Sequence, residues 1–252
     1  MTNRCRIGFL LFCLTCLACT GCGSAEKPLE VHVAAAANLR GVLEDIARTF
    51  LSRTGIHVVP TIGATAQLSQ QIENGAPVDL FLSADTQHVD QLIARGFADP
   101  QSRAVYARGQ LVLWAPSRSD ITSLRDLTRP DVKQVGCARP ELAPYGAAAI
   151  QALKKEGLWQ EVEPKLVYGQ SISASKQFAD SGNVAAAFTA LSLVYNLHRH
   201  FVPIDERLHD PLEQALCIMK QAAQPAAARQ FRDFVLSPEG RATFKRYGYG
   251  LP

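Results

Sequence analysis

Four short turns, each placed where a predicted strand passes into a predicted helix, carry residues that could bind an anion. In the first turn Asn38 follows the apolar segment VHVAAAA and precedes an amphipathic stretch. Thr65, Tyr145 and Ile172 stand at the other three. Unpaired backbone N–H groups and the positive end of the helix dipole favour an anion at such a helix start. Asn is also a good N-cap and a neutral amide donor, and alanines such as Ala37 let a ligand approach the backbone closely.

The donors at these turns are all neutral, and that selects a type of ligand. They are the side chains of Asn38, Thr65 and Tyr145 and the backbone N–H of Ile172. A fully ionised tetrahedral dianion carries acceptor oxygens only, so its charge can be buried where each oxygen accepts hydrogen bonds. An oxyanion that keeps a proton would call for a carboxylate acceptor as well. The residues therefore predict a site for a fully deprotonated oxyanion.

Other polar residues are better explained by structure than by catalysis or metal binding. Asp79 and Asp85 flank a buried strand, where Asp is favoured as a turn or cap residue. The HRH run at 198–200 is interpreted as a solvated loop, because a metal site needs three or four convergent ligands. The sequence has no GxSxG elbow, Walker loop, HExxH or GxGxxG after a strand. We expect no enzyme activity, no direct metal ligands and no cofactor.

The N-terminal 25 residues are typical of a bacterial secretory signal, with a basic start, an apolar core and small residues at the end. Cleavage after Ala25 is favoured, and lipid attachment at Cys22 is the weaker alternative; both predict export to the periplasm. Without this segment 24 basic residues face 23 acidic ones, a balance of +1 that gives no indication of a nucleic-acid partner. Five of the seven cysteines lie in it, and we predict that the other two, Cys137 and Cys217, are buried free thiols, with a bridge as the alternative.

Strands and helices alternate along the rest of the chain, which predicts an α/β protein with mostly parallel sheets. One example is the helix after Asn38, where apolar residues recur at three-and-four spacing from Leu39 to Leu51 and Gly55 follows. The pattern runs through two cycles, so we expect two lobes with a crevice between them. Lobe one is predicted to span 26–108 and 218–252, and lobe two 109–217. A strand near 214–219 is expected to return to the first lobe.

The chain resembles the exported molybdate-binding proteins of ABC importers. The shared segments are VAAAANL at the first turn, GATAQLSQQIENGAPVDLFLSAD in lobe one, PELAPYG at the start of lobe two and the terminal KRYGYGLP. The resemblance implies a two-lobe periplasmic binding protein that closes over molybdate or tungstate. It also implies delivery to a membrane permease driven by an ATPase. We expect a monomer.

By this resemblance the family's ligand positions fall on Asn38, Thr65, Tyr145 and the N–H of Ile172. Some members have a tyrosine donor where this chain has Ala190, which has no hydroxyl. We hypothesise that Tyr145 supplies the missing phenol from the other side. Ala37 and Ala190 are the weaker candidates for ligand contact.

Two alternatives remain open at the level of sequence. One is a binding protein for sulfate or another tetrahedral dianion, because neutral donors distinguish such anions only by cavity size. The other is an exported hydrolase of phosphate or sulfate esters. That enzyme would need a nucleophile with a base, or a metal site, and the sequence offers neither.

Overall fold

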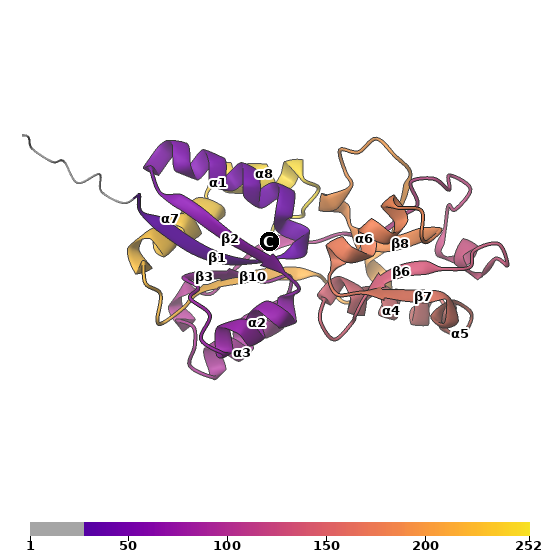
Figure 1. Cartoon of the computed structure of the whole chain (residues 1–252), viewed down its shortest axis with the longest axis horizontal. Helices are drawn as coiled ribbons and strands as arrows, with labels where there is room; N and C mark the ends of the chain where they lie inside the picture. Colours follow the sequence, from indigo (N-terminus) through magenta and orange to yellow (C-terminus); the bar gives the residue numbers. More distant parts are fainter. Residues whose placement is uncertain (1–27) are drawn as a thin grey trace, which may run out of the picture.

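Two lobes, each built on a five-stranded sheet, lie side by side along the long axis of the molecule (Figure 1). The structure, a computed structural model, describes residues 28–252. The expected signal segment, with both of its processing alternatives, lies outside the described residues. The predicted α/β fold with two lobes is confirmed.

The sheet of lobe one has the strand order β2-β1-β3-β10-β4. Its strands are β1 (Glu30–Ala36), β2 (His57–Gly63), β3 (Leu80–Leu82), β4 (Ala104–Arg108) and β10 (Glu213–Ile218). β1 is parallel to both β2 and β3, whereas β10 is antiparallel to β3 and β4. Parallel pairing therefore holds for three strands, and the late strand β10 makes the sheet mixed.

Helices cover both faces of this sheet, because β1 presents apolar residues on both sides. Val33 belongs to the core under one helix layer and its neighbour Ala34 to the core under the other. The first layer contains α1 (Arg40–Thr54), α7 (Pro225–Leu236) and α8 (Pro238–Arg246), and the second contains α2 (Thr65–Glu73) and α3 (Gln87–Ala94), as Figure 1 shows. Short 3-10 turns flank them at η1 (Ala37–Leu39) and η2 (Pro100–Ser102). Gly55 ends α1 with φ of 71°, as the pattern predicts.

The sheet of lobe two has the order β7-β6-β8-β5-β9 and is mixed in the same way. Its strands are β5 (Leu111–Trp114), β6 (Val135–Ala138), β7 (Leu166–Gly169), β8 (Ala186–Ala190) and β9 (Phe201–Pro203). β6 is parallel to β7 and β8, whereas β5 is antiparallel to β8 and β9. The short strands β4 and β9 have no counterpart in the sequence-based prediction.

Lobe two also buries apolar residues on both sides of its sheet. Along β5, Leu113 belongs to one core and Val112 and Trp114 to the other. The helices are α4 (Pro144–Lys155), α5 (Trp159–Val162) and α6 (Ile172–Asp180), with 3-10 turns η3 (Leu124–Thr128), η4 (Glu163–Lys165), η5 (Leu191–Leu193) and η6 (Glu206–Leu208). α4 and α6 each begin directly after a loop that follows a strand, so their N-termini come to the carboxyl ends of β6 and β7.

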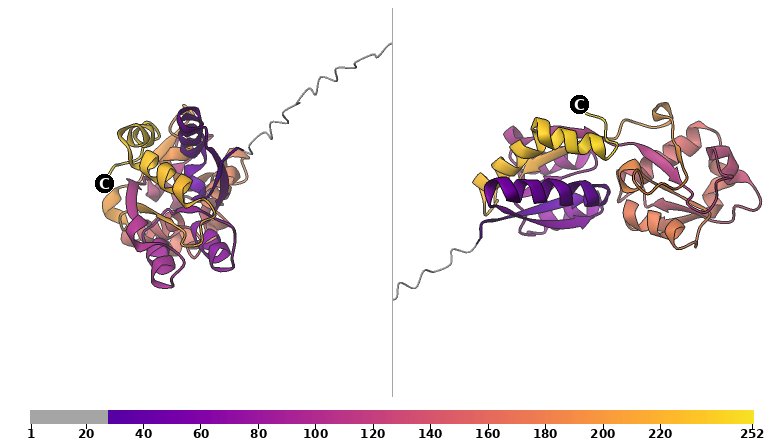
Figure 2. Two further views of the ribbon diagram at one scale, coloured as in Figure 1. Left: turned by 90° about the vertical axis from the view of Figure 1, so that its left-hand side faces the viewer. Right: turned by 90° about the horizontal axis from the view of Figure 1, so that it is seen from above.

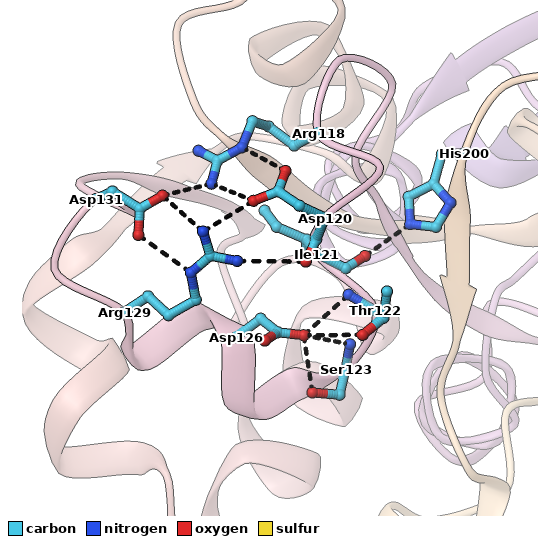
Figure 3. A network of polar contacts seen from close by, with 9 residues as sticks. All are labelled: Arg118, Asp120, Ile121, Thr122, Ser123, Asp126, Arg129, Asp131 and His200. Atoms are coloured by element: carbon cyan, nitrogen blue, oxygen red, sulfur yellow. Dashed lines mark hydrogen bonds and ion pairs between the residues drawn. The ribbon is translucent and has the colours of Figure 1, made fainter.

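A network of surface ion pairs holds the loop that joins β5 to β6 (Figure 3). Arg118 and Arg129 each pair with both Asp120 and Asp131. The Arg118 hydrogen bond contributes most to holding the pKa of Asp120 well below its usual range. All of these side chains are at least partly exposed to water, so the network shapes the loop more than it stabilises the fold.

The chain crosses between the lobes at two neighbouring places. One crossing follows β4 at Gly109, the other precedes β10 at Leu212, and the N–H of Gly109 donates to the carbonyl oxygen of Leu212 at 2.9 Å. Seen from above, the two lobes lie next to each other, and the boundary between them is called the seam below (Figure 2). The boundary expected at residue 217 is wrong, because all of β10 pairs in the first sheet. The alternation of strands and helices does not show which sheet a strand joins, because this depends on partner strands from distant parts of the chain.

Both cysteines of the described part of the chain are free and buried, one in each lobe. Cys137 lies in β6 and Cys217 in β10. Burial raises the pKa of each thiol to about 12. The thiols therefore stay protonated at neutral pH and behave as small apolar side chains.

We predict that Gly146→Ala destabilises the protein by about 2 kcal/mol, because α4 packs too closely on β6 to admit a methyl group. A Cβ at Gly146 would lie 2.2 Å from the carbonyl oxygen of Ala138, which is backbone and cannot move aside. Gly41→Ala in α1 is the matched control, since its Cβ would meet only the side chain of Tyr247, at 3.1 Å. Urea unfolding monitored by circular dichroism measures both. Equal midpoints for the two variants would contradict the prediction.

Candidate functional site

The four turns singled out by sequence converge on the seam between the lobes. Asn38 lies in η1 of lobe one and Thr65 is the first residue of α2. In lobe two, Tyr145 is the second residue of α4 and Ile172 is the first residue of α6. Asn38, Thr65 and Tyr145 are each only 1% exposed and Ile172 is 3% exposed. The seam therefore encloses all four residues, although their role in binding stays a prediction.

Hydrogen bonds across the seam hold these segments together. The Ser173 hydroxyl donates to the carbonyl oxygen of Ala37 at 3.1 Å, and the Ser192 hydroxyl donates to the carbonyl oxygen of Asn38 at 2.9 Å. The N–H of Ala66 donates to the carbonyl oxygen of Leu142 at 3.2 Å. In each case a residue of one lobe donates to backbone of the other, so the lobes are closed on each other at this point.

Asn38 is the centre of a buried polar network. Its amide Nδ2 donates to Gln214 Oε1 and to the Tyr249 hydroxyl, both at 2.9 Å. Gln214 Nε2 in turn donates to the Tyr145 hydroxyl across the seam at 2.9 Å. Asn38 Oδ1 is buried and has no hydrogen-bond partner among the described residues. The network thus joins Asn38 to Tyr145 through a residue that the sequence analysis did not single out.

Burial keeps the phenols of this network in the neutral form. It raises the pKa of Tyr145 well above its ordinary value, and hydrogen bonds from Gln214 and Asn38 offset only part of that rise. Burial is also the largest cause of the raised pKa of Tyr249. Each hydroxyl therefore keeps its proton across the neutral range and can donate a hydrogen bond.

Thr65 lies slightly apart from this network. Its hydroxyl accepts a hydrogen bond from the N–H of Ala84 at 3.3 Å, which leaves the hydroxyl hydrogen free to donate. The weaker candidates contribute backbone only: Ala37 accepts from Ser173, and Ala190 ends β8 just before the turn that carries Ser192. Ala190 has no hydroxyl, and Tyr249 brings a second phenol to Asn38 from the C-terminal tail.

Asp79 and Asp85 both have structural partners. Asp79 accepts from the N–H groups of His32 and Gln224, before the start of β3 and therefore at the end of the sheet away from Asn38. One carboxylate oxygen of Asp85 lies 2.8 Å from the ring nitrogen Nδ1 of His88. The other accepts a hydrogen bond from the backbone N–H of His88, in the first turn of α3. These contacts agree with the turn and cap roles predicted for the two residues.

The described residues show neither a metal cluster nor a membrane helix. No group of three or more His, Cys, Asp or Glu side chains is placed to hold a metal ion in the part of the chain that the structure describes. In the HRH run, His200 Nε2 lies 2.6 Å from the carbonyl oxygen of Ile121 (Figure 3). No helix between residues 28 and 252 is long and apolar enough to span a membrane.

The sequence profile of a known family, described as bacterial extracellular solute-binding protein, matches residues 31–250. The chain belongs to this family. It is 37% identical over 223 residues to the molybdate-binding protein ModA of Rhodobacter capsulatus, covering 87% of this chain and 88% of that protein. It is also 37% identical over 234 residues to ModA of Azotobacter vinelandii, covering 90% and 92%. The resemblance found in the sequence is thereby confirmed.

A solved structure supports the same relationship. The Azotobacter vinelandii periplasmic molybdate-binding protein superimposes with a TM-score of 0.84 at 32% identity, covering 88% of this chain and 99% of that one. The chain therefore shares its fold with this molybdate-binding protein.

Sequence reasoning missed the residues that support Asn38 from the C-terminal part of the chain. Gln214 and Tyr249 carried weak signals: Gln214 is a polar residue within the apolar strand QALCIM, and Tyr249 belongs to the terminal KRYGYGLP segment. Neither signal says which residue it meets, because the contacts with Asn38 span 176 and 211 positions of sequence.

We predict that removing the two seam hydroxyls loosens the contact between the lobes. In the double variant Ser173→Ala and Ser192→Ala, the carbonyls of Ala37 and Asn38 each lose a donor that comes from lobe two. Each loss is worth about 1 kcal/mol, so the open form becomes more populated. Small-angle X-ray scattering of the protein without ligand should show a larger radius of gyration.

Ser181→Ala is the matched control for this measurement. The Ser181 hydroxyl donates to the carbonyl oxygen of Phe178 within lobe two and is exposed. Its loss should leave the radius of gyration unchanged. An unchanged radius in the double variant would show that the seam does not depend on these hydroxyls.

Proposed function

We propose that this chain is an exported solute-binding protein that captures molybdate between its two lobes and delivers it to an ABC import permease with its ATPase. Its family membership and the 37% identity to two proteins named for molybdate binding support the ligand. Tungstate, which has the same charge and shape, is proposed as a second ligand. The mature protein acts in the periplasm as a monomer and catalyses no reaction.

The observation that carries this proposal is the enclosure of neutral donors without a charged side chain. Asn38, Thr65 and Tyr145 are buried together at the seam. Asp79, the one carboxylate that is buried among the described residues, lies at the other end of the sheet. A bound dianion would meet hydrogen-bond donors and helix N-termini instead of a counter-charge. This arrangement suits an anion that has no proton to give.

The same chemistry explains why a binding role fits better than hydrolysis. A hydrolase of phosphate or sulfate esters needs an activated nucleophile or a metal-bound water at the ester. Among the described residues the Thr65 hydroxyl is hydrogen-bonded to the backbone N–H of Ala84 and to no side chain that could act as a base, and burial keeps the phenol of Tyr145 neutral. Closure over an intact anion, followed by opening at the permease, requires only the hinge that the two crossings provide.

We predict that molybdate and tungstate stabilise the purified mature protein selectively. A ligand that binds only the folded state stabilises it by about 4 kcal/mol at a concentration 1,000 times its Kd. Thermal-shift measurements with molybdate, tungstate, sulfate and phosphate compare the anions directly. Stabilisation by sulfate alone would show that sulfate, and not molybdate, is the ligand. Turnover of a phosphate or sulfate ester by metal-free protein would overturn the binding role.

We also predict that Thr65→Val weakens molybdate binding at least tenfold. The substitution keeps the shape of the side chain and removes its hydroxyl hydrogen, and one lost hydrogen bond to a charged ligand costs about 1.5 to 3 kcal/mol. Isothermal titration calorimetry measures the Kd. Thr189→Val is the matched control, because Thr189 is also buried and its hydroxyl has no partner among the described residues. Equal Kd values for the two variants would remove Thr65 from the site.

A further inference from the structure

Among the described residues, Gln214 is the buried side chain that is hydrogen-bonded to both Asn38 in lobe one and Tyr145 in lobe two. It is fully buried in β10, and its Oε1 also lies 3.0 Å from the Tyr106 hydroxyl. The ladder between β10 and β4 shifts register at Gln214 and skips Tyr106. Such a shift re-aims side chains, and these two point toward each other.

The space around the contact between Gln214 and Tyr145 is fully used. A Cβ at Gly109, on the first crossing, would lie 2.0 Å from the Tyr145 hydroxyl and 2.6 Å from Gln214 Nε2. A larger residue at position 109 would therefore collide with these two side chains. The backbone conformation itself does not require glycine, because its φ lies outside the left-handed region. The backbone of the crossing thus confines the amide of Gln214 next to the phenol.

The amide of Asn38 has one end tied to its neighbours and one end free. Nδ2 has two acceptors, whereas Oδ1 is buried without a partner. A buried acceptor without a donor costs about 1 to 3 kcal/mol. An acceptor-only anion placed at that free end would also be repelled by Oδ1. A half turn of the amide about its last bond exchanges the two ends and leaves the heavy atoms in place.

The Asn38 amide cannot turn by itself. If it did, its Oδ1 would face Gln214 Oε1 at 2.9 Å, acceptor against acceptor. If both amides turn, Gln214 Nε2 donates to Asn38 Oδ1 and to the Tyr106 oxygen, whose own hydrogen goes to the carbonyl oxygen of Ser83 at 2.9 Å. Gln214 Oε1 then accepts from Tyr145, and Asn38 Nδ2 takes the free position. The Tyr249 hydroxyl turns its hydrogen from the Asn38 carbonyl oxygen to Oδ1, while Ser192 still donates to that carbonyl. This concerted arrangement pairs the acceptor that otherwise has no donor.

We propose that Gln214 is a positioning residue of the oxyanion site: its amide orients the Asn38 amide so that Nδ2 is offered to the ligand. This inference rests on the proposed function, because it concerns the donors that meet a deprotonated oxyanion. Gln214 acts through Asn38 and needs no contact with the anion itself. Its loss leaves Asn38 free to present Oδ1, which lowers the affinity for an anion that only accepts hydrogen bonds.

A double-mutant cycle between Gln214→Met and Asn38→Ala, measured by isothermal titration calorimetry with molybdate, tests the proposal. Methionine keeps the length and apolar part of the glutamine side chain. We expect Gln214→Met to raise the Kd at least tenfold when Asn38 is present and less than threefold when Asn38 is alanine. A purely structural role of Gln214 would raise the Kd by the same factor in both backgrounds, and that result would overturn the proposal.

Ser102→Ala is the control for disturbance of β10. The Ser102 hydroxyl accepts from the N–H of Ile218 at the far end of the same strand and lies away from Asn38. Wild type and this control should bind molybdate alike. If they bind and the cycle is additive, only the role of Gln214 is lost. If wild type binds no molybdate, the proposed function fails and this inference fails with it.

A second measurement on the wild-type protein keeps the proposal testable if Gln214→Met folds poorly. Side-chain amide resonances of Asn38 and Gln214 can be followed by ¹⁵N–¹H NMR during a titration with molybdate. We expect a large shift of an Asn38 side-chain N–H resonance, because Nδ2 becomes a donor to the anion. An Asn38 amide that does not respond to bound molybdate would overturn the proposal.

Discussion

Each hydrogen-bonding atom enclosed at the seam needs a partner, and the arrangement of the two lobes depends on this requirement. Closing the lobes removes water from the amide of Asn38 and the phenol of Tyr145, and the cost of burying such groups unpaired amounts to about 1 to 3 kcal/mol each. Gln214 is a hydrogen-bond partner of both groups, and Tyr249 is a second partner of the Asn38 amide. Closure of the lobes therefore both buries polar groups and brings some of their hydrogen-bond partners into place.

Anion binding follows from the same requirement. A site that leaves donors in excess is unfavourable when empty and favourable when an acceptor-rich ion fills it. Neutral donors also leave the site without a fixed charge when no ligand is bound. In this protein the phenols are kept protonated by burial, which preserves their donor role over a wide range of pH.

Local sequence was sufficient to find the four turns, because a strand end, a small polar residue and the start of an amphipathic helix are all encoded within a few residues. The helix after Asn38 and its end at Gly55 follow from that local pattern. The sheets were predicted as more parallel than they are, and the short strands β4 and β9 were missed, because antiparallel partners come from distant segments. For the same reason Gln214 and Tyr249, which meet Asn38 only in the folded chain, could not be assigned to the site.

β10 is central to these observations, because it pairs with β3 and β4 in the first sheet and carries Gln214, one of the side chains that link the lobes. It follows the second crossing directly, so its position is fixed by β3 and β4 on either side and by the hydrogen bond between the crossings. A hinge motion that separates the lobes would leave this strand in lobe one and pull Tyr145 away from Gln214. The amide of Gln214 would then lose its phenol partner while keeping Asn38, so the donor arrangement around Asn38 changes at the moment when the site opens. Coupling of this kind would tie release of an anion to opening of the lobes, since opening removes the Tyr145 phenol that holds the amide of Gln214 in one orientation.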